Sequence, residues 1–462
     1  MTTFRERAGI DVGTPKAAAN DAGARRLAAH RERAVSEFPA MEAMRDRARD
    51  IRLHTLSHLD TYLAEFAASV ESAGGTVFFA ADGAEANRYI AELASARGVT
   101  KAVKSKSMVT EEIDLNHALE RVGVDVVETD LGEFIVQLSG DTPSHIIAPV
   151  LHWTRFGVGE LFAEKIDVPY TDDPIELNAI ARAYLRKIFL DAEMGISGVN
   201  FGVASTGSIC TVTNEGNGRL TTTAPRIHVA VMGMERVVPT PGDLAVMLEV
   251  LARSATGQRL SVYSNIVTGP RRPGDPDGPD ELHVVIVDNG RSQVLASAQS
   301  EILACIRCGA CLNICPVYRE VGGHAYGSVY SGPVGAVLTP VLLETGTDLP
   351  FASSLCGACQ EVCPVRIEIP RMLLNLRASS SGSGDSEFRW LRAGLGAYAR
   401  AATHPVLWRS FLGAGSVISR TVGRSGWIRR LPWHGGNWTD ERDLVAPAKQ
   451  SFHAWWKANR GT

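Results

Sequence analysis

The sequence lacks three features that would place the protein in a membrane, outside the cell or on nucleic acid. It has no apolar run of about 18 residues, so no helix is expected to span a bilayer. The N-terminus carries Arg5, Glu6 and Arg7 and no apolar core, which predicts no export and a cytoplasmic location. The 47 Lys and Arg residues against 51 Asp and Glu leave a net charge of −4, which argues against general nucleic-acid binding.

Nucleotide-binding motifs are absent as well. No G-x-G-x-x-G or Walker A run occurs, so nothing predicts a nicotinamide or nucleotide cofactor. No flavin motif is visible either, although two-electron chemistry normally needs a cofactor of that kind. The chain of 462 residues is 45% hydrophobic and 21% charged, an ordinary globular balance. Its length suits roughly two to four domains.

Cysteine is scarce except in one stretch, because seven of the eight cysteines lie between residues 305 and 364. The first run reads C-x2-C-x2-C-x3-C-P and the second reads C-x2-C-x3-C-P. This is the spacing of bacterial ferredoxins, in which the fourth cysteine of a run ligates the other cluster. The spacing therefore predicts two iron–sulfur clusters, with [4Fe–4S] expected. Cluster 1 would take Cys305, Cys308, Cys311 and Cys363, and cluster 2 would take Cys315, Cys356 and Cys359.

Cluster 2 is one cysteine short, and Ser353 stands where the missing residue would be. Ser353 could ligate through its oxygen, the fourth iron could stay open, or the cluster could be [3Fe–4S]; a plain loop hydroxyl is the simplest interpretation. The sequence does not choose between these. Zinc also uses paired C-x2-C units, but it has no need of the C-x2-C-x2-C-x3-C-P run. Disulfides are not expected in a cytosolic chain.

Residues 74–296 read as an α/β domain, because short apolar runs alternate with helical stretches. A largely parallel sheet is expected, with a crossover helix at Ala84–Ala96. A helix from about Gln293 to Ala304 would lead directly into the first cysteine run. The predicted strands are Val77–Phe79, Val103, Val124–Val127, Phe134–Val136, Ile209–Val212, Ile227–Val231 and Val284–Val287.

Three polar stretches could form a ligand site at the carboxyl ends of these strands. In Lys104–Glu112, Ser107 is the expected N-cap of a helix, and Lys104 and Lys106 could hold a carboxylate or phosphate. Glu128–Glu133 supplies three carboxylates, either acid–base groups or a polar loop. Asn214–Arg219 reads as a hairpin loop in which Glu215 is a weaker catalytic candidate. The catalytic residues are otherwise unknown, and Lys104, Lys106 and Glu215 are weak candidates.

Residues 1–73 are predicted to be helical and to pack on the rest of the chain. His54 and His58 have metal-binding spacing on a helix, but no third ligand follows, so a solvated helix face is preferred. Cys210 is expected to be a buried strand residue. Arg307, Arg319 and Arg366 either offset the negative charge of the clusters or are surface cations.

The C-terminal part changes character. Residues 297–377 form the predicted dicluster domain, and the Ser- and Gly-rich residues 378–387 read as a linker. Residues 388–462 hold seven of the eight tryptophans and 12 Lys and Arg against 3 Asp and Glu. That composition is typical of a protein interface or a membrane-surface contact. A small helical cap with its own core is the alternative.

The cysteine runs at Cys305–Arg319 and Ser354–Val365 resemble the dicluster region of the lactate utilization protein B family. Lys104–Glu112, Glu128–Glu133 and Thr213–Asn217 are similar to that family's lactate-utilization (LUD) domain. The resemblance covers about residues 40–375. It implies an isomerase/CoA-transferase-like α/β domain, an α-helical ferredoxin-type domain and a helical C-terminal extension. Seven cluster cysteines are also the family pattern.

The resemblance further implies a bacterial cytoplasmic iron–sulfur protein that works with two partner proteins to oxidise L-lactate to pyruvate. We expect an electron carrier rather than the catalytic subunit, passing electrons to an acceptor such as a quinone. The basic, Trp-rich C-terminal region could provide a peripheral membrane or quinone-reductase contact. Two alternatives stay open: a non-redox enzyme that uses an open cluster iron as a Lewis acid on a hydroxy acid, and a redox-switched metabolite sensor.

Overall fold

The computed structural model describes residues 3–382, 386–422, 426–431, 436–439, 442–448 and 450–460. The chain divides into two compact units, Met1–Arg377 and Ala378–Thr462. Among the described residues, no helix combines the length and apolarity needed to cross a membrane.

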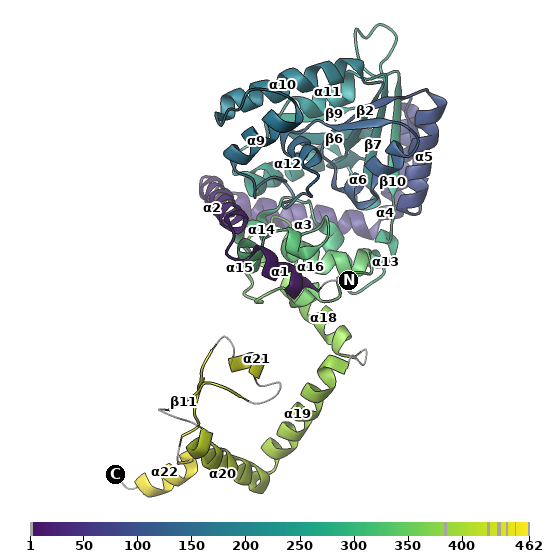
Figure 1. Ribbon diagram of the computed structural model, residues 1–462. Coiled ribbons are helices and arrows are strands. Elements are labelled where there is room, and N and C mark those ends of the chain that lie inside the picture. The colour runs from purple at the N-terminus through teal and green to yellow at the C-terminus, as the bar shows by residue number, and fades with distance from the viewer. Residues whose placement is uncertain are drawn as a thin grey trace. The chain divides into compact units, whose positions relative to one another are not determined.

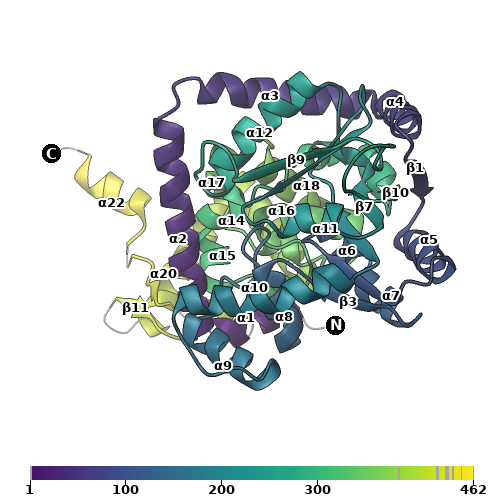
Figure 2. The ribbon, with the colours of Figure 1, turned by 90° about the horizontal axis from the view of Figure 1, so that it is seen from above.

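The first unit begins with four helices that brace the rest of it (Figures 1 and 2). Helix α2 starts at Pro15 behind an N-cap threonine, Thr14, whose hydroxyl accepts a hydrogen bond from the Ala17 amide. Seen from above, α2 and α3 run along two adjoining edges of the unit. The four helices are α1 (Phe4–Asp11), α2 (Pro15–Ser36), α3 (Met41–Ser57) and α4 (Leu59–Ser72). His54 and His58 are exposed on α3 and its end, and His54 Nε2 lies 3.0 Å from the Tyr62 hydroxyl.

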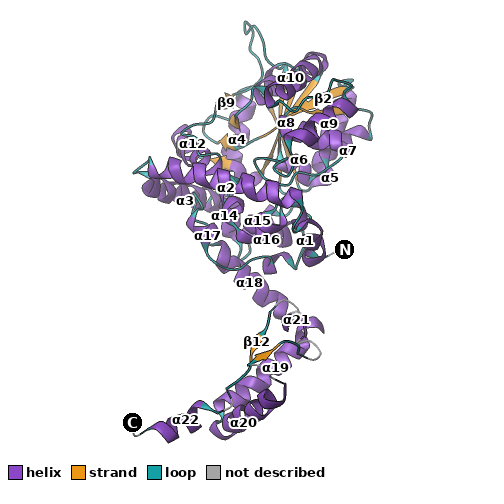
Figure 3. Ribbon diagram, turned by 60° about the vertical axis from the view of Figure 1, so that its left-hand side comes forward, coloured by secondary structure: helices purple, strands orange, loops and turns teal. Residues whose placement is uncertain are grey.

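A six-stranded sheet forms the centre of the α/β part, with helices on both faces (Figure 3). Its order is β1-β10-β7-β4-β2-β3, and every pairing within it is parallel. The parallel α/β prediction is therefore confirmed. The strands are β1 (Thr76–Ala80), β2 (Lys101–Lys104), β3 (Asp125–Glu128), β4 (Met194–Gly198), β7 (Ile227–Gly233) and β10 (Glu281–Val287).

A second sheet of four strands, in the order β8-β5-β6-β9, packs beside the first. Its strands are β5 (Phe201–Val203), β6 (Ser208–Thr213), β8 (Val237–Val238) and β9 (Tyr263–Val267). Cys210 is fully buried in β6, as predicted. The residues after β6 lead into a helix and not into a hairpin, so the loop interpretation of Asn214–Arg219 was wrong beyond Gly216.

The helices of the α/β part confirm one prediction and correct another. Asp82 caps the predicted crossover helix, which runs over Gly83–Ala96. Phe134–Val136, predicted as a strand, lies in a helix, because the Asp130 carboxylate caps the amide of Gly132 and a short apolar run fits either structure. The helices are α5 (Gly83–Ala96), α6 (Met108–Glu112), α7 (Leu115–Glu120), α8 (Leu131–Ser139), α9 (Arg155–Lys165), α10 (Pro174–Asp191), α11 (Asn217–Thr223) and α12 (Pro241–Ala255).

Residues 288–377, which follow β10 in the first unit, are helical and contain no strand (Figure 3). The single helix predicted over Gln293–Ala304 is two short ones, since the Ser297 hydroxyl donates to the Val294 carbonyl and ends the first. The α-helices are α13 (Arg291–Leu295), α14 (Ala310–Ile314), α15 (Pro316–Val321), α16 (Gly332–Leu342), α17 (Ala358–Glu361) and α18 (Ile369–Gly382). The helical fold predicted for this region is confirmed, while the proposed domain boundaries stay predictions.

The second unit contains two long amphipathic helices and several short elements. Among the side chains of this unit whose burial the structure describes, Ile428 is the one apolar side chain that is buried, while Leu395, Phe411 and Trp455 are exposed. Trp433 lies outside the described residues, as do residues 383–385 within the predicted linker 378–387. The elements are α19 (Ser386–Thr403), α20 (Pro405–Val422), β11 (Trp427–Ile428), α21 (Gly436–Thr439), β12 (Leu444–Val445) and α22 (Phe452–Asn459).

Candidate functional site

The two cysteine runs fold into loops of the same shape. Arg307 and Gly309 in the first run have positive φ angles of 59° and 76°, and Leu355 and Gly357 in the second have 56° and 85°. A short helix, α14 or α17, follows each loop directly. This left-handed geometry turns the backbone tightly, so that neighbouring thiols can converge on one point.

The four cysteines predicted for cluster 1 line a single cavity. Cys305, Cys308, Cys311 and Cys363 share its wall with apolar side chains such as Ile146 and Val334. The Arg307 amide lies 3.4 Å from Cys305 Sγ, and the Ile367 amide 3.4 Å from Cys363 Sγ. Burial raises the pKa of Cys308 to about 12 and that of Cys363 to about 11. Such thiols become thiolates when a metal takes the charge, so the cavity fits an iron–sulfur cluster.

Cys315, Cys356 and Cys359, predicted for cluster 2, interact electrostatically with one another, and Cys356 is exposed. Ser353 occupies the position that Cys305 holds in the first loop. The Leu355 amide donates to Ser353 Oγ at 3.1 Å, just as the Arg307 amide faces Cys305 Sγ at 3.4 Å. The serine hydroxyl therefore lies where the first run presents a ligand.

Two arginines of the N-terminal helices donate hydrogen bonds to backbone carbonyls of the second cysteine run. Arg45 is buried, and its Nε and one terminal nitrogen donate to the Cys363 carbonyl at 3.1 and 2.9 Å. The same nitrogen donates to the Glu361 carbonyl at 2.6 Å, and Arg31 donates to the Val362 carbonyl at 2.9 Å. Sequence reasoning missed these contacts, because an arginine on an amphipathic helix reads as a solvated charge.

The carboxyl ends of the parallel strands open into a cavity of about 320 Å³. Lys106 and Glu215, two of the three predicted candidates, line it together with Asp130. Lys104 does not line it. That side chain is buried, with its ammonium 2.7 Å from Glu128 Oε1 and 3.1 Å from Thr110 Oγ1. Ser107 caps α6 through the Thr110 amide, as predicted.

Carboxyl groups crowd the Lys106 side of this cavity. Lys106 forms an ion pair with Glu133, and Glu133 shares a hydrogen bond with Asp130. Burial, together with the charge of Asp130, raises the pKa of Glu133 to about 8, and burial raises that of Glu111 to about 7. Burial also raises the pKa of Asp130 and Glu215. Glu133 and Glu111, which do not themselves line the cavity, can therefore hold and release protons near neutral pH.

A buried charge cluster lies on the other side. Arg291 pairs with Glu112 at 2.8 Å and with Glu235 at 2.7 Å, and all three side chains are almost fully buried. Arg307 Nη2 lies 3.6 Å from Glu235, and its guanidinium stacks over the Tyr330 ring at 4.6 Å. The guanidiniums of Arg291, Arg307 and Arg236 hold the pKa of Glu235 at about 2 against the effect of burial.

The three arginines singled out in the sequence have different surroundings. Arg307 is largely buried between the cluster 1 loop and the strand-end cavity. Arg366 is partly exposed and pairs with Glu42 and Asp46 of α3. Arg319 donates to the Asn313 carbonyl at 2.7 Å. Of the three, Arg307 is therefore the one whose charge acts in a buried site.

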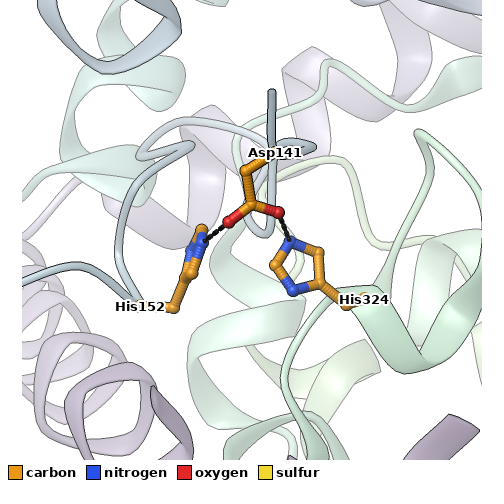
Figure 4. A group of neighbouring side chains, drawn as sticks. All are labelled: Asp141, His152 and His324. Carbon is orange, nitrogen blue, oxygen red and sulfur yellow. Dashed lines mark hydrogen bonds and ion pairs between the residues drawn. The ribbon is translucent and has the colours of Figure 1, made fainter. Parts of the chain in front are cut away.

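Asp141, His152 and His324 form a further group that the sequence did not reveal (Figure 4). His152 Nε2 lies 2.9 Å from Asp141 Oδ2, and this bond lowers the pKa of Asp141. His324 Nε2 lies 3.6 Å from Asp141 Oδ1 and donates to the Thr142 carbonyl at 2.8 Å. Because a carbonyl only accepts, that nitrogen carries its proton and is not a metal ligand here. The group links the α/β part to the cysteine region.

These features define the class of protein: an iron–sulfur protein in which a dicluster region is built onto an α/β domain. Comparison with protein families gives the same division. Residues 63–287 match the LUD domain, residues 301–367 the 4Fe-4S dicluster domain, and residues 382–460 the lactate utilisation protein B C-terminal domain.

Relatives align along nearly the whole chain. The lactate utilization protein B of Bacillus pumilus is 46% identical over 98% of this chain and 97% of its own length. That of Shouchella clausii is 46% identical over 94% and 92%. The uncharacterized electron transport protein YkgF of Escherichia coli is 44% identical over 99% and 97%. The chain belongs to the lactate utilization protein B family.

A crystal structure of a DUF162 family protein from Deinococcus radiodurans also aligns, with 15% identity and a TM-score of 0.29 over 50% of this chain and 98% of the other. A score that low does not establish a shared fold.

Proposed function

We propose that the protein is the iron–sulfur electron-transfer subunit of a system that oxidises L-lactate to pyruvate. It would work with two partner proteins in the cytoplasm, and it would allow lactate to serve as a carbon source. The names of the relatives support the lactate system, and one relative is named as an electron transport protein. Iron–sulfur clusters of this type supply one-electron transfer.

One observation carries the proposal. Arg307 and Ile146 line both the four-cysteine cavity and the cavity at the strand ends. The two sites therefore share a wall within the first unit, and the chain passes from β10 through α13 into Cys305. An electron donor bound at the strand ends would lie next to cluster 1.

For the cofactors we propose two [4Fe–4S] clusters with the ligand sets predicted from the spacing. Cys305, Cys308, Cys311 and Cys363 would hold cluster 1, and Cys315, Cys356 and Cys359 would hold cluster 2. The matching amide contacts of Ser353 and Cys305 support Ser353 Oγ as the fourth ligand of cluster 2. Leu355 and Gly357 would present these groups through the same left-handed turn as the first loop.

The exit for electrons would lie at cluster 2, because Cys356 is exposed while Cys308 and Cys363 are buried. A partner or quinone reductase that docks there would approach within a short distance of the cluster. The exposed Trp455 and Trp456 on α22 support a role of the C-terminal unit in binding a partner protein or in a peripheral membrane contact.

The Lewis-acid alternative has less support. It needs an open iron of cluster 2 beside a substrate cavity, yet the strand-end cavity is lined by Arg307 of the first loop and by no residue of the second run. A redox-switched sensor would need ligand affinity to change with cluster oxidation state. Neither alternative is favoured by a specific contact.

The test is electron paramagnetic resonance on the anaerobically purified chain, alone and with its partners, before and after L-lactate. The proposal predicts that both clusters become reduced when the partners are present. Substrate that perturbs an oxidised cluster without reducing it would support the Lewis-acid reaction instead. No spectral change under any condition would refute electron transfer from lactate.

A further inference from the structure

The buried charges around Glu235 do not balance within the protein. Four guanidinium groups, those of Arg52, Arg236, Arg291 and Arg307, act on Glu235, and one of them, Arg291, also pairs with Glu112. Buried charges are costly unless they are paired, so an excess of cations in a buried site calls for anions. The thiolates of cluster 1 are one source, and a bound ligand is another.

Two of the four cations do not face the strand-end cavity. The guanidinium nitrogens of Arg52 donate hydrogen bonds to backbone carbonyls, among them those of Val237 at 2.9 Å and Leu303 at 3.0 Å. Arg291 is occupied by its two carboxylates. Arg236 and Arg307, in contrast, both line the cavity, although Arg236 Nη1 also donates to the Cys305 carbonyl at 2.9 Å. Arg307 Nη1 is buried and has no hydrogen-bond partner.

The loop that carries Arg307 does not need an arginine there. Leu355 holds the equivalent position in the second loop and adopts nearly the same φ, 56° against 59°. The left-handed backbone is therefore compatible with an apolar side chain. The charge at Arg307 must serve something other than the turn, and its guanidinium lies on the wall shared by the two cavities.

The rest of the cavity is lined by polar side chains that could bind a second polar group of the same ligand. Lys106, Asp130 and Glu215 line it. Asn200 and Asn214 add amide donors, since their Oδ1 atoms already accept hydrogen bonds from backbone amides. A ligand with a carboxylate and a neighbouring hydroxyl or carbonyl would find partners of both kinds. A purely apolar ligand would leave these groups unpaired.

We propose that the strand-end cavity binds a small 2-hydroxy or 2-oxo monocarboxylate, whose carboxylate pairs with Arg307 and Arg236 beside cluster 1. The hydroxyl or carbonyl oxygen faces the Lys106, Asp130 and Glu215 side. The choice of acid rests on the proposed function, whereas the anion site rests on the two guanidiniums that line the cavity and on the unpaired Nη1 of Arg307.

The experiment measures equilibrium binding of L-lactate and pyruvate to the anaerobic holoprotein of full length, with lactamide as the uncharged analogue. The variant is Arg307→Leu, which copies the residue that the second loop carries in the same conformation. The matched control is Arg366→Gln. This variant also removes an arginine charge close to cluster 1, because the Arg366 amide donates to the Cys363 carbonyl. Arg366 lines neither cavity, so its loss should not affect ligand binding.

Wild type and Arg366→Gln should bind the acids and not lactamide, and Arg307→Leu should bind them about tenfold or more weakly. The visible spectrum and iron content of each variant show whether the clusters are intact. Failure of either acid to bind the wild type would overturn the proposal. So would full binding by an Arg307→Leu protein that has only a changed cluster potential, because Arg307 would then serve the cluster.

The result separates this proposal from the function above. Binding of lactate without reduction of the clusters would leave the anion site standing and contradict direct electron donation at this cavity. Reduction of the clusters through the partners, with no binding to the isolated holoprotein, would overturn the anion site and leave the electron-transfer role.

Discussion

Replacing Arg45 by Met tests whether the N-terminal helices hold the cysteine region in place. Arg45 lies on α3, more than 300 residues before the carbonyls that it binds. The methionine keeps most of the apolar stem and removes the donors. The carbonyls of Cys363 and Glu361 then lose hydrogen bonds from a charged group. Glu42, the carboxylate partner of Arg45, is largely exposed and keeps its contact with Arg366.

The expected cost follows from these two carbonyls. The Cys363 carbonyl keeps the Arg366 amide as a donor and the Glu361 carbonyl is only partly buried, so neither becomes an unpaired buried acceptor. What is lost is hydrogen bonding from a charged group, at about 1.5–3 kcal/mol per bond, so Arg45→Met should lower the free energy of unfolding by about 2–4 kcal/mol. The midpoint of anaerobic thermal unfolding should fall by about 2–5 °C, because a unit of this size has an unfolding entropy of about 0.8 kcal/mol/K. Cys363 belongs to the predicted ligand set of cluster 1, so the purified variant should also hold less iron.

The matched control is Arg47→Met on the same helix. Arg47 is 61% exposed and makes one ion pair, with Asp243 at 3.4 Å, so its loss should change stability by less than about 1 kcal/mol. The assay compares iron per chain, visible absorbance and unfolding midpoint for the two variants and wild type. Equal values for Arg45→Met and Arg47→Met would refute the bracing role of Arg45.

Three further predictions concern other residues. Ser353→Ala should produce a [3Fe–4S] signal in the oxidised protein and Ser353→Cys should not; identical spectra for both and wild type would exclude a ligand at this position. The folded-state pKa of Glu133, about 8 against an ordinary 4.5, means that stability falls as pH rises from about 5 to 8. Glu133→Gln should flatten this slope in pH-dependent unfolding, and an unchanged slope would contradict the assignment. Arg291→Met should cost about 3–5 kcal/mol in the same assay, because Glu112 stays buried without a cation while Glu235 keeps Arg307 and Arg236. Exposed Arg97→Met should cost less than about 1 kcal/mol, and equal losses would argue against the buried pair.

The cysteine spacing carried most of the information about the candidate site. It predicted which thiols could share a cluster, because two-residue gaps and a following proline constrain where each side chain can reach. It also marked Ser353 as a substitute for a cysteine. The structure adds that Ser353 Oγ accepts a hydrogen bond from the amide two residues later, as Cys305 Sγ does in the first loop.

The alternation of apolar runs and helical stretches predicted the parallel sheet correctly, but one short apolar run was assigned to the wrong type of secondary structure. An apolar run as short as Phe134–Val136 is compatible with a strand or a helix, and the N-cap at Asp130 favours the helix. Glu112 and Glu235 read as ordinary polar residues, and Arg291 gives no local signal. Their partners lie up to 179 residues apart, so only the folded chain reveals the buried charge cluster.

The central claim, that two clusters in this chain carry electrons from lactate, is tested most directly by redox-monitored electron paramagnetic resonance with spin counting. The protein is kept anaerobic and is measured with its partners, before and after L-lactate. The account predicts two reducible clusters per chain, both reduced by lactate when the partners are present. A single cluster, a zinc ion in place of iron, or clusters that lactate never reduces would contradict it.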